Sequence, residues 1–139
     1  MINRVHHIAF VVRDLERAIH LYQDVFKLNC FKRFYFEERG AEIALFQIEG
    51  LILELICPQE KGHKPYEHLE KYGEGFFHIA YEVDDLELGR KTLEMYGMDV
   101  KGLNPSTGVD WQLLWLNSNQ TMGTKIQIVE EKLKEEGKK

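Results

Sequence analysis

The stretch HIAFVVRDLE at residues 7–16 returns as HIAYEVDDLE at residues 78–87, and seven of the ten positions are identical at a shift of 71. Each copy opens with a histidine in an apolar, strand-like run and ends near an aspartate, Asp14 or Asp85, that is placed to cap a helix. Self-similarity at a long, fixed shift indicates a repeated structural unit. The sequence therefore predicts two copies of one unit.

The same order of elements follows each copy. Apolar residues recur at helical spacing after each aspartate, and three strand-like runs then follow. The predicted apolar stripes are Leu15, Ala18, Ile19, Tyr22 and Phe26 in the first helix, and Leu86, Leu93 and Tyr96 in the second. The expected strands cover residues 5–12, 29–38, 41–48, 51–57, 76–83, 98–103, 109–117 and 124–130. A short helical piece is expected near Pro65, because proline is tolerated in a first turn.

This order is a βαβββ unit, repeated. Such a unit cannot bury a sheet face alone, so we expect the two to pair edge to edge. The predicted fold class is α+β, with two βαβββ modules that form a curved eight-stranded half-barrel around a metal cavity. We expect one domain over residues 1–139, divided into module one at about 3–57, a linker at 58–75, module two at about 76–130 and a charged tail at 131–139.

Composition narrows the class of protein. The chain has 139 residues and 44% hydrophobic content, enough for a core, and its net charge of -5 is spread without a basic stripe for nucleic acid. No apolar run approaches the ~18 residues of a membrane span, and the start lacks the pattern of a signal peptide. Cys30 and Cys57 are too few for a disulfide framework. We therefore expect a cytoplasmic protein with reduced cysteines and with neither a nucleic acid nor a membrane as its partner.

Two polar residues interrupt strands that are otherwise apolar. Glu54 interrupts LILELI at residues 51–56, and Gln127 holds the matching place in IQIV at residues 126–129, at a shift of 73. A buried carboxylate is costly unless a cation compensates it. We interpret both side chains as metal ligands.

His7 and His78 complete the predicted metal site. They open the two first strands, so the four residues form two pairs that the repeat relates. Two imidazoles, a carboxylate and an amide oxygen suit one divalent ion such as Zn, Ni, Co, Mn or Fe. His6 faces the opposite way from His7 and is interpreted as a packing residue.

At these residues the chain resembles the vicinal oxygen chelate superfamily, which includes glyoxalase I, methylmalonyl-CoA epimerase, extradiol dioxygenases and fosfomycin-resistance proteins. The resemblance covers about residues 3–130 and is closest to the glyoxalase and epimerase branch. Its best local matches are HHIAFVVRDLERAIHLYQDVF at 6–26, LELICP at 53–58, LEKYGEGFFHIAYEVDDLE at 69–87 and KIQIVE at 125–130.

The resemblance implies roles for individual residues. His7, Glu54 and His78 match the ligands of the family, whereas Gln127 stands where the family usually has a glutamate that takes part in proton transfer. An amide cannot transfer that proton. Glu54 is therefore the first choice of catalytic base, and Glu42, in GAEIALFQ at 40–47, is the second.

The leading prediction is a metal-dependent lyase or isomerase that removes a proton next to a polarised carbonyl of a small-molecule substrate. The alternatives are an Fe(II)-dependent extradiol-type dioxygenase and a non-catalytic binding or resistance protein. The resemblance implies a homodimer. Residues 104–111, NPSTGVDW, are expected to cover the cavity mouth, and they lack the basic cluster that would favour a CoA thioester.

Overall fold

The structure is a computed structural model that describes residues 1–102 and 111–131. The strands are β1 Ile2–Val11, β2 Asn29–Phe36, β3 Ala41–Ile48, β4 Leu51–Pro58, β5 Gly75–Val83, β6 Val100–Lys101, β7 Trp111–Leu116 and β8 Ile126–Glu131. The α-helices are α1 Leu15–Ile19, α2 Lys64–Tyr72 and α3 Leu86–Met95. A π-helix, η1, covers His20–Val25, and the 3-10 helices η2 and η3 cover Glu37–Arg39 and Ser118–Gln120.

The eight strands form one mixed sheet in the order β2-β3-β4-β1-β5-β8-β7-β6. β1 pairs with β4, and β5 with β8, in parallel, whereas the hairpin neighbours within each repeat are antiparallel. The predicted α+β class and the repeated βαβββ order are thus confirmed. The predicted loop at 104–111, except for Trp111, lies outside the described residues, as do most of the predicted tail and the ends of two predicted strands.

Contacts divide the chain into two compact units. The first unit is residues 7–77, and the second unit combines residues 1–6 with the chain from residue 78 onward. In the second unit, Arg4 forms an ion pair of 2.8 Å with Glu82, and Asn3 donates a hydrogen bond of 2.7 Å to Asp84. These contacts explain why the start of β1 belongs with the second half of the sequence.

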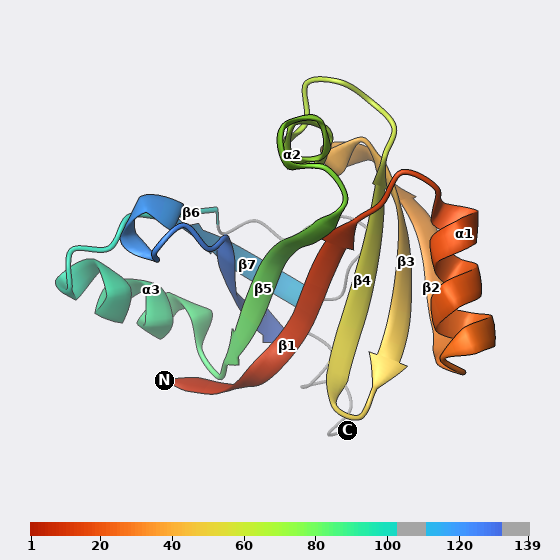
Figure 1. Cartoon of the computed structure of the whole chain (residues 1–139). Helices are drawn as coiled ribbons and strands as arrows, with labels where there is room; N and C mark the ends of the chain where they lie inside the picture. Colours follow the sequence, from red (N-terminus) through yellow and green to blue (C-terminus); the bar gives the residue numbers. More distant parts are fainter. Residues whose placement is uncertain (103–110, 132–139) are drawn as a thin grey trace. The chain divides into compact units, whose positions relative to one another are not determined.

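In the first unit, α1 and η1 lie along one face of the strands (Figure 1). Asp14 caps α1 as predicted, because its Oδ1 accepts a hydrogen bond of 3.1 Å from the Arg17 amide. The predicted helical piece with Pro65 in its first turn is α2. The core on the α1 face contains Leu15, Ala44, Phe46, Leu53, Leu55 and Cys57.

The helix after Asp14 widens into η1, which the sequence does not predict. The Phe26 amide donates to the carbonyl oxygen of Leu21 at 2.9 Å, five residues back. This wider turn rotates the later positions, so Phe26 is 55% exposed and the prediction that it faces the sheet is wrong. Phe26 instead packs edge-on against Tyr22, with ring centroids 5.4 Å apart.

In the second unit, α3 is α-helical over its whole length. Asp85 caps it as predicted, accepting a hydrogen bond of 3.0 Å from the Leu88 amide. Leu86 is buried against Val83, Leu114 and Ile128. Tyr96 is 81% exposed because it follows the end of α3, so its predicted place in the apolar stripe is wrong. None of the helices within residues 1–102 and 111–131 has the length and apolar character needed to cross a membrane.

Candidate metal centre

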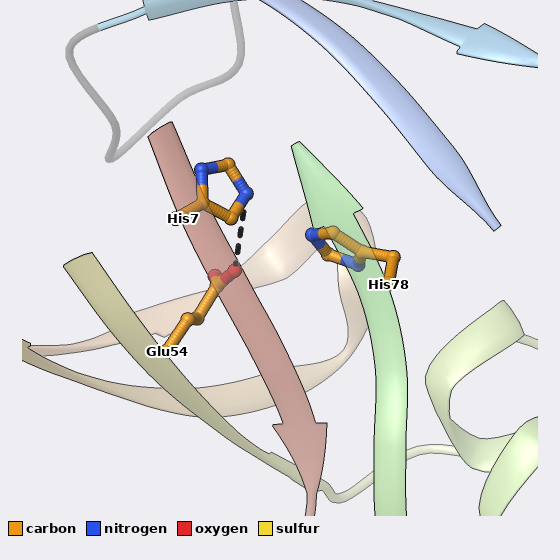
Figure 2. Close-up of side chains that lie close together, drawn as sticks. All are labelled: His7, Glu54 and His78. Atoms are coloured by element: carbon orange, nitrogen blue, oxygen red, sulfur yellow. Dashed lines mark ion pairs between the residues drawn. The ribbon is translucent and has the colours of Figure 1, made fainter. Parts of the chain in front are cut away.

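The first unit brings His7 and Glu54 together. β1 and β4 pair so that Ala9 is the Cα partner of Glu54, which places Glu54 on the same face as His7, two residues from Ala9. Both side chains are buried, and His7 Nε2 lies 3.6 Å from Glu54 Oε1. Figure 2 draws these two residues with their ion pair dashed, together with His78 from β5.

The electrostatics of Glu54 are unusual. Burial raises the pKa of its carboxyl group from 4.5 to about 7, and the positive charge of Arg39 opposes this rise. Burial lowers the pKa of Arg39 in turn, against the attraction of Glu54 and Glu38. A carboxyl group with a pKa close to neutral can both accept and release a proton at physiological pH.

Sequence reasoning missed Arg39, which lies in the turn between β2 and β3. Gly40 follows it with φ of 56°, and its carbonyl oxygen accepts hydrogen bonds from the amides of Gln59 at 2.8 Å and Glu60 at 3.1 Å. The His63 Nδ1 atom lies 3.2 Å from the carbonyl oxygen of Glu38. These contacts tie the Arg39 turn to the segment that follows β4. No pattern in the sequence marks a turn arginine as a partner of a strand glutamate.

The second unit holds His78 and Gln127 on one face. Gln127 is the Cα partner of Ala80, two residues from His78, so both side chains point to the same side of the strands. Both are buried, and Trp115, the other cross-strand partner of Gln127, packs edge-on against the His78 ring at 5.1 Å. Gln127 Oε1 is buried and has no hydrogen-bond partner among the described residues. A buried amide oxygen in this state is suited to bind a cation.

His6 makes a polar contact as well as a packing one. Its ring is fully buried and lies edge-on to Trp111 at 4.6 Å, within the second unit. Its Nε2 atom lies 2.8 Å from Glu131 Oε1. Glu82, a buried carboxylate on the same strand face as His78, is the other polar residue that sequence reasoning missed, although its alternation with His78 and Ala80 was visible.

Glu42 is not brought to Glu54. It is the Cα partner of Cys57 on β4, three residues from Glu54, so the regular β3–β4 ladder places the two carboxylates on opposite faces. Its side chain is 40% exposed, and its Oε2 atom lies 3.7 Å from Arg33 Nη2. The register therefore gives no support to Glu42 as a second base beside Glu54.

The residue types at the site suit a metal. His7, Glu54 and His78 are three buried side chains of metal-binding type, and Gln127 adds an amide oxygen without a hydrogen-bond partner. A carboxylate that is costly to bury in ionised form gains its counter-charge when a divalent cation binds. The residue types that each unit contributes therefore suit such an ion.

Comparison with known proteins places the chain in a family. Residues 6–112 match the family described as the Glyoxalase/Bleomycin resistance protein/Dioxygenase superfamily. Because this match covers most of the chain, the protein belongs to that superfamily. The resemblance seen in the repeated histidine stretches and in the last strands is thereby confirmed.

Two individual proteins are similar to this chain over most of their length. The chain is 30% identical over 131 residues to the ethylmalonyl-CoA/methylmalonyl-CoA epimerase of Cereibacter sphaeroides, covering 92% of this chain and 98% of that one. It is 27% identical over 131 residues to the uncharacterized protein YqjC of Bacillus subtilis, covering 94% of each. The named relative is an isomerase, which supports an enzyme of that kind.

Solved structures show the same fold. The methylmalonyl-CoA epimerase from Mycobacterium tuberculosis matches with a TM-score of 0.86 at 21% identity, over 94% of this chain and 89% of that one. A methylmalonyl-CoA epimerase in complex with methylmalonyl-CoA and NH4+ matches with a TM-score of 0.88 at 22% identity, over 94% and 96%.

Proposed function

We propose that the protein is a metal-dependent isomerase of the epimerase type, which moves a proton at the carbon next to the carbonyl of an acyl-CoA thioester. The observation that carries this proposal is Glu54, a buried carboxyl group with a pKa of about 7 on the same face as His7. The epimerase of Cereibacter sphaeroides supports the substrate class, in preference to a glyoxalase-type lyase reaction.

We further propose that His7, Glu54, His78 and Gln127 together hold one divalent ion, Zn, Ni, Co, Mn or Fe. The support is the donor set, the burial of Glu54 and the unpartnered oxygen of Gln127. When bound, the ion would polarise the substrate carbonyl and stabilise the negative charge that develops on its oxygen.

Glu54 is the proposed base. In the metal-free chain the pKa of its carboxyl group is about 7, and a bound divalent ion would lower this pKa, so the group would be present as the carboxylate that accepts the substrate proton. Arg39 keeps that pKa from rising further. Gln127 is an amide and cannot accept a proton, so its position supplies no second base to return the proton from the other face of the substrate. We therefore expect Glu54 to release the abstracted proton to solvent, and a water molecule to supply the proton that returns to the other face of the carbon.

The test replaces Glu54 by Gln and follows deuterium incorporation into methylmalonyl-CoA and ethylmalonyl-CoA in D2O by mass spectrometry. We expect a loss of roughly 10² to 10⁴ in exchange rate, the usual contribution of a general base. Glu42→Gln is the matched control, because Glu42 lies on the opposite strand face and should leave exchange unchanged. Undiminished exchange in Glu54→Gln would remove Glu54 from the mechanism.

One observation favours a second candidate. Two histidines and one carboxylate, His7, His78 and Glu54, are also the ligand types of Fe(II)-dependent oxygenases. Anaerobic loading with Fe(II), followed by oxygen uptake with catechols, distinguishes the two reactions. Full metal occupancy with neither oxygen uptake nor proton exchange would instead indicate a binding protein.

A further inference from the structure

A cavity of about 630 Å³ lies in the first unit, between η1, the start of α1 and the strands. Phe10 and Leu55 line its floor and are Cα partners, one position along from the pair Ala9 and Glu54. Side chains alternate along strands, so this floor is the face opposite to Glu54. The cavity is therefore separate from the candidate metal centre, and its volume is in the range that holds a small organic ligand.

Two arginines stand at this cavity. Arg13 and Arg17 both line it and are exposed, and no ion pair to either guanidinium is found within residues 1–102 and 111–131. The acidic groups beside them already accept hydrogen bonds from backbone amides. Asp14 accepts one from Arg17 N at 3.1 Å, and Glu74 accepts one from Arg13 N at 2.8 Å. Since no ion pair to them is found in the described part of the chain, the two guanidinium groups are available as charged donors.

The internal repeat shows that these arginines are not needed by the fold. At the shift of 71, Arg13 corresponds to Asp84 and Arg17 to Leu88, so the second copy of the same strand and helix has neither cation. That copy caps its helix in the same way through Asp85. The basic pair is therefore a feature of the first repeat alone.

The helix that follows the capping aspartate has a different geometry in the two repeats. In the first repeat η1 is a π-helix that contributes His20, Leu21 and Tyr22 to the cavity wall, whereas α3 in the second repeat stays α-helical. π-helical turns are rare, and they occur frequently at functional sites. Leu21 is also 41% exposed, which leaves apolar surface open at the cavity.

We propose that this cavity binds a small amphipathic anion. Its apolar body packs on Phe10, Leu21 and Tyr22, and its carboxylate or phosphate head is held by Arg13 and Arg17. A guanidinium matches either head group through paired hydrogen bonds. Because the cavity and Glu54 lie on opposite strand faces, this ligand is a second ligand and does not depend on the proposed isomerase reaction.

Isothermal titration calorimetry of the full chain, treated with EDTA, tests the proposal with decanoate, decyl phosphate and decan-1-ol as probes. We expect saturable binding of decanoate or decyl phosphate at one site, and at least roughly tenfold weaker binding of the uncharged alcohol. The stronger of the two anions identifies the preferred head group.

Two variants locate the binding. Arg13→Ala/Arg17→Ala should weaken anion binding by roughly tenfold or more, and Ala18→Phe should abolish it by filling the cavity. Arg90→Ala is the matched control, since Arg90 pairs with Glu87 and Glu94 on α3 and should not affect the affinity.

Three results would overturn the proposal: equal affinity for decanol and the anions, unchanged affinity in the double arginine variant, or no saturable heat with any probe. Circular dichroism confirms that each variant is folded. Glu54→Gln should bind the anion with unchanged affinity. The binding result can therefore be interpreted even if the chain has no isomerase activity.

Discussion

Glu54 and Gln127 occupy the same position in the two repeats. Glu54 is the Cα partner of Ala9 and Gln127 is the Cα partner of Ala80, and the two alanines correspond at the shift of 71. The predicted equivalence of Glu54 and Gln127 at a shift of 73 is therefore confirmed. The protein carries a carboxylate in one repeat and an amide in the other, at one structural position.

This equivalence makes an exchange of the two side chains informative. Glu54→Gln should lower affinity for a divalent ion by on the order of 10- to 100-fold, because the site loses its anionic ligand. The double variant Glu54→Gln/Gln127→Glu should recover much of that affinity, since the donor set is restored. Metal content after dialysis checks both. Equal metal loss in the single and double variants would argue against a shared ion.

The stability of the metal-free chain should depend on pH through Glu54. Its pKa is about 7 in the folded chain against an ordinary value of 4.5, so the folded state binds this proton more tightly than the unfolded state does. The stabilisation is fully present below about pH 4.5 and is lost as the pH rises through about 7, a change on the order of 3 kcal/mol.

Urea unfolding of EDTA-treated protein at about pH 5 and about pH 8 measures this loss. Glu54→Gln should remove the part of the pH dependence that belongs to this carboxyl group, because an amide does not titrate. A variant that keeps the whole difference would show that other groups cause it.

Arg39 should set the pKa of Glu54 from outside the strand. Its charge lowers that pKa, so Arg39→Met should raise it and move the alkaline loss of stability to a higher pH. Arg33→Met is the control, because Arg33 pairs with Glu16 and Glu42 at the surface. The midpoint of the stability change against pH is the measurement. An unchanged midpoint in Arg39→Met would show that the charge of Arg39 does not affect the pKa of Glu54.

Gly40→Ala should destabilise the turn that carries Arg39. The residue has φ of 56°, and an added Cβ would lie 2.6 Å from His63 Cδ2. The left-handed conformation alone costs a non-glycine residue roughly 1–2 kcal/mol. The free energy of unfolding measures the effect, and Gly40→Ala/His63→Ala should recover the steric part. If the double variant is no more stable than the single one, the contact with His63 does not contribute.

Much of the fold was predictable because the same pattern of strands and helix occurs in both halves of the sequence. Asp14 and Asp85 cap helices as expected, β3 has its predicted bounds of residues 41–48, and β4 needs one more residue than predicted. Local chemistry determines these features: a cap, an apolar alternation and a glycine turn. The grouping of Glu54 with the two first-strand histidines followed from the repeat, which relates His7 to His78 and Glu54 to Gln127.

The remaining features depend on contacts that the sequence does not encode locally. Glu42 was predicted as a second base, but the register of the β3–β4 hairpin decides which face of the strands it occupies, and the sequence does not reveal that register. Phe26 fits a helical stripe until the helix widens into η1. Arg39 acts on Glu54 from a turn, where no periodicity marks it.

The division of β1 between the two units has a consequence for how such a chain can be cut. Residues 1–6 lie with the second unit, and Arg4 supplies the cation that pairs with the buried Glu82. A fragment that starts at residue 78 therefore keeps a buried acid and leaves its counter-ion on the other piece. The boundary between the two sequence repeats and the boundary between the two compact units therefore differ by the first six residues of the chain.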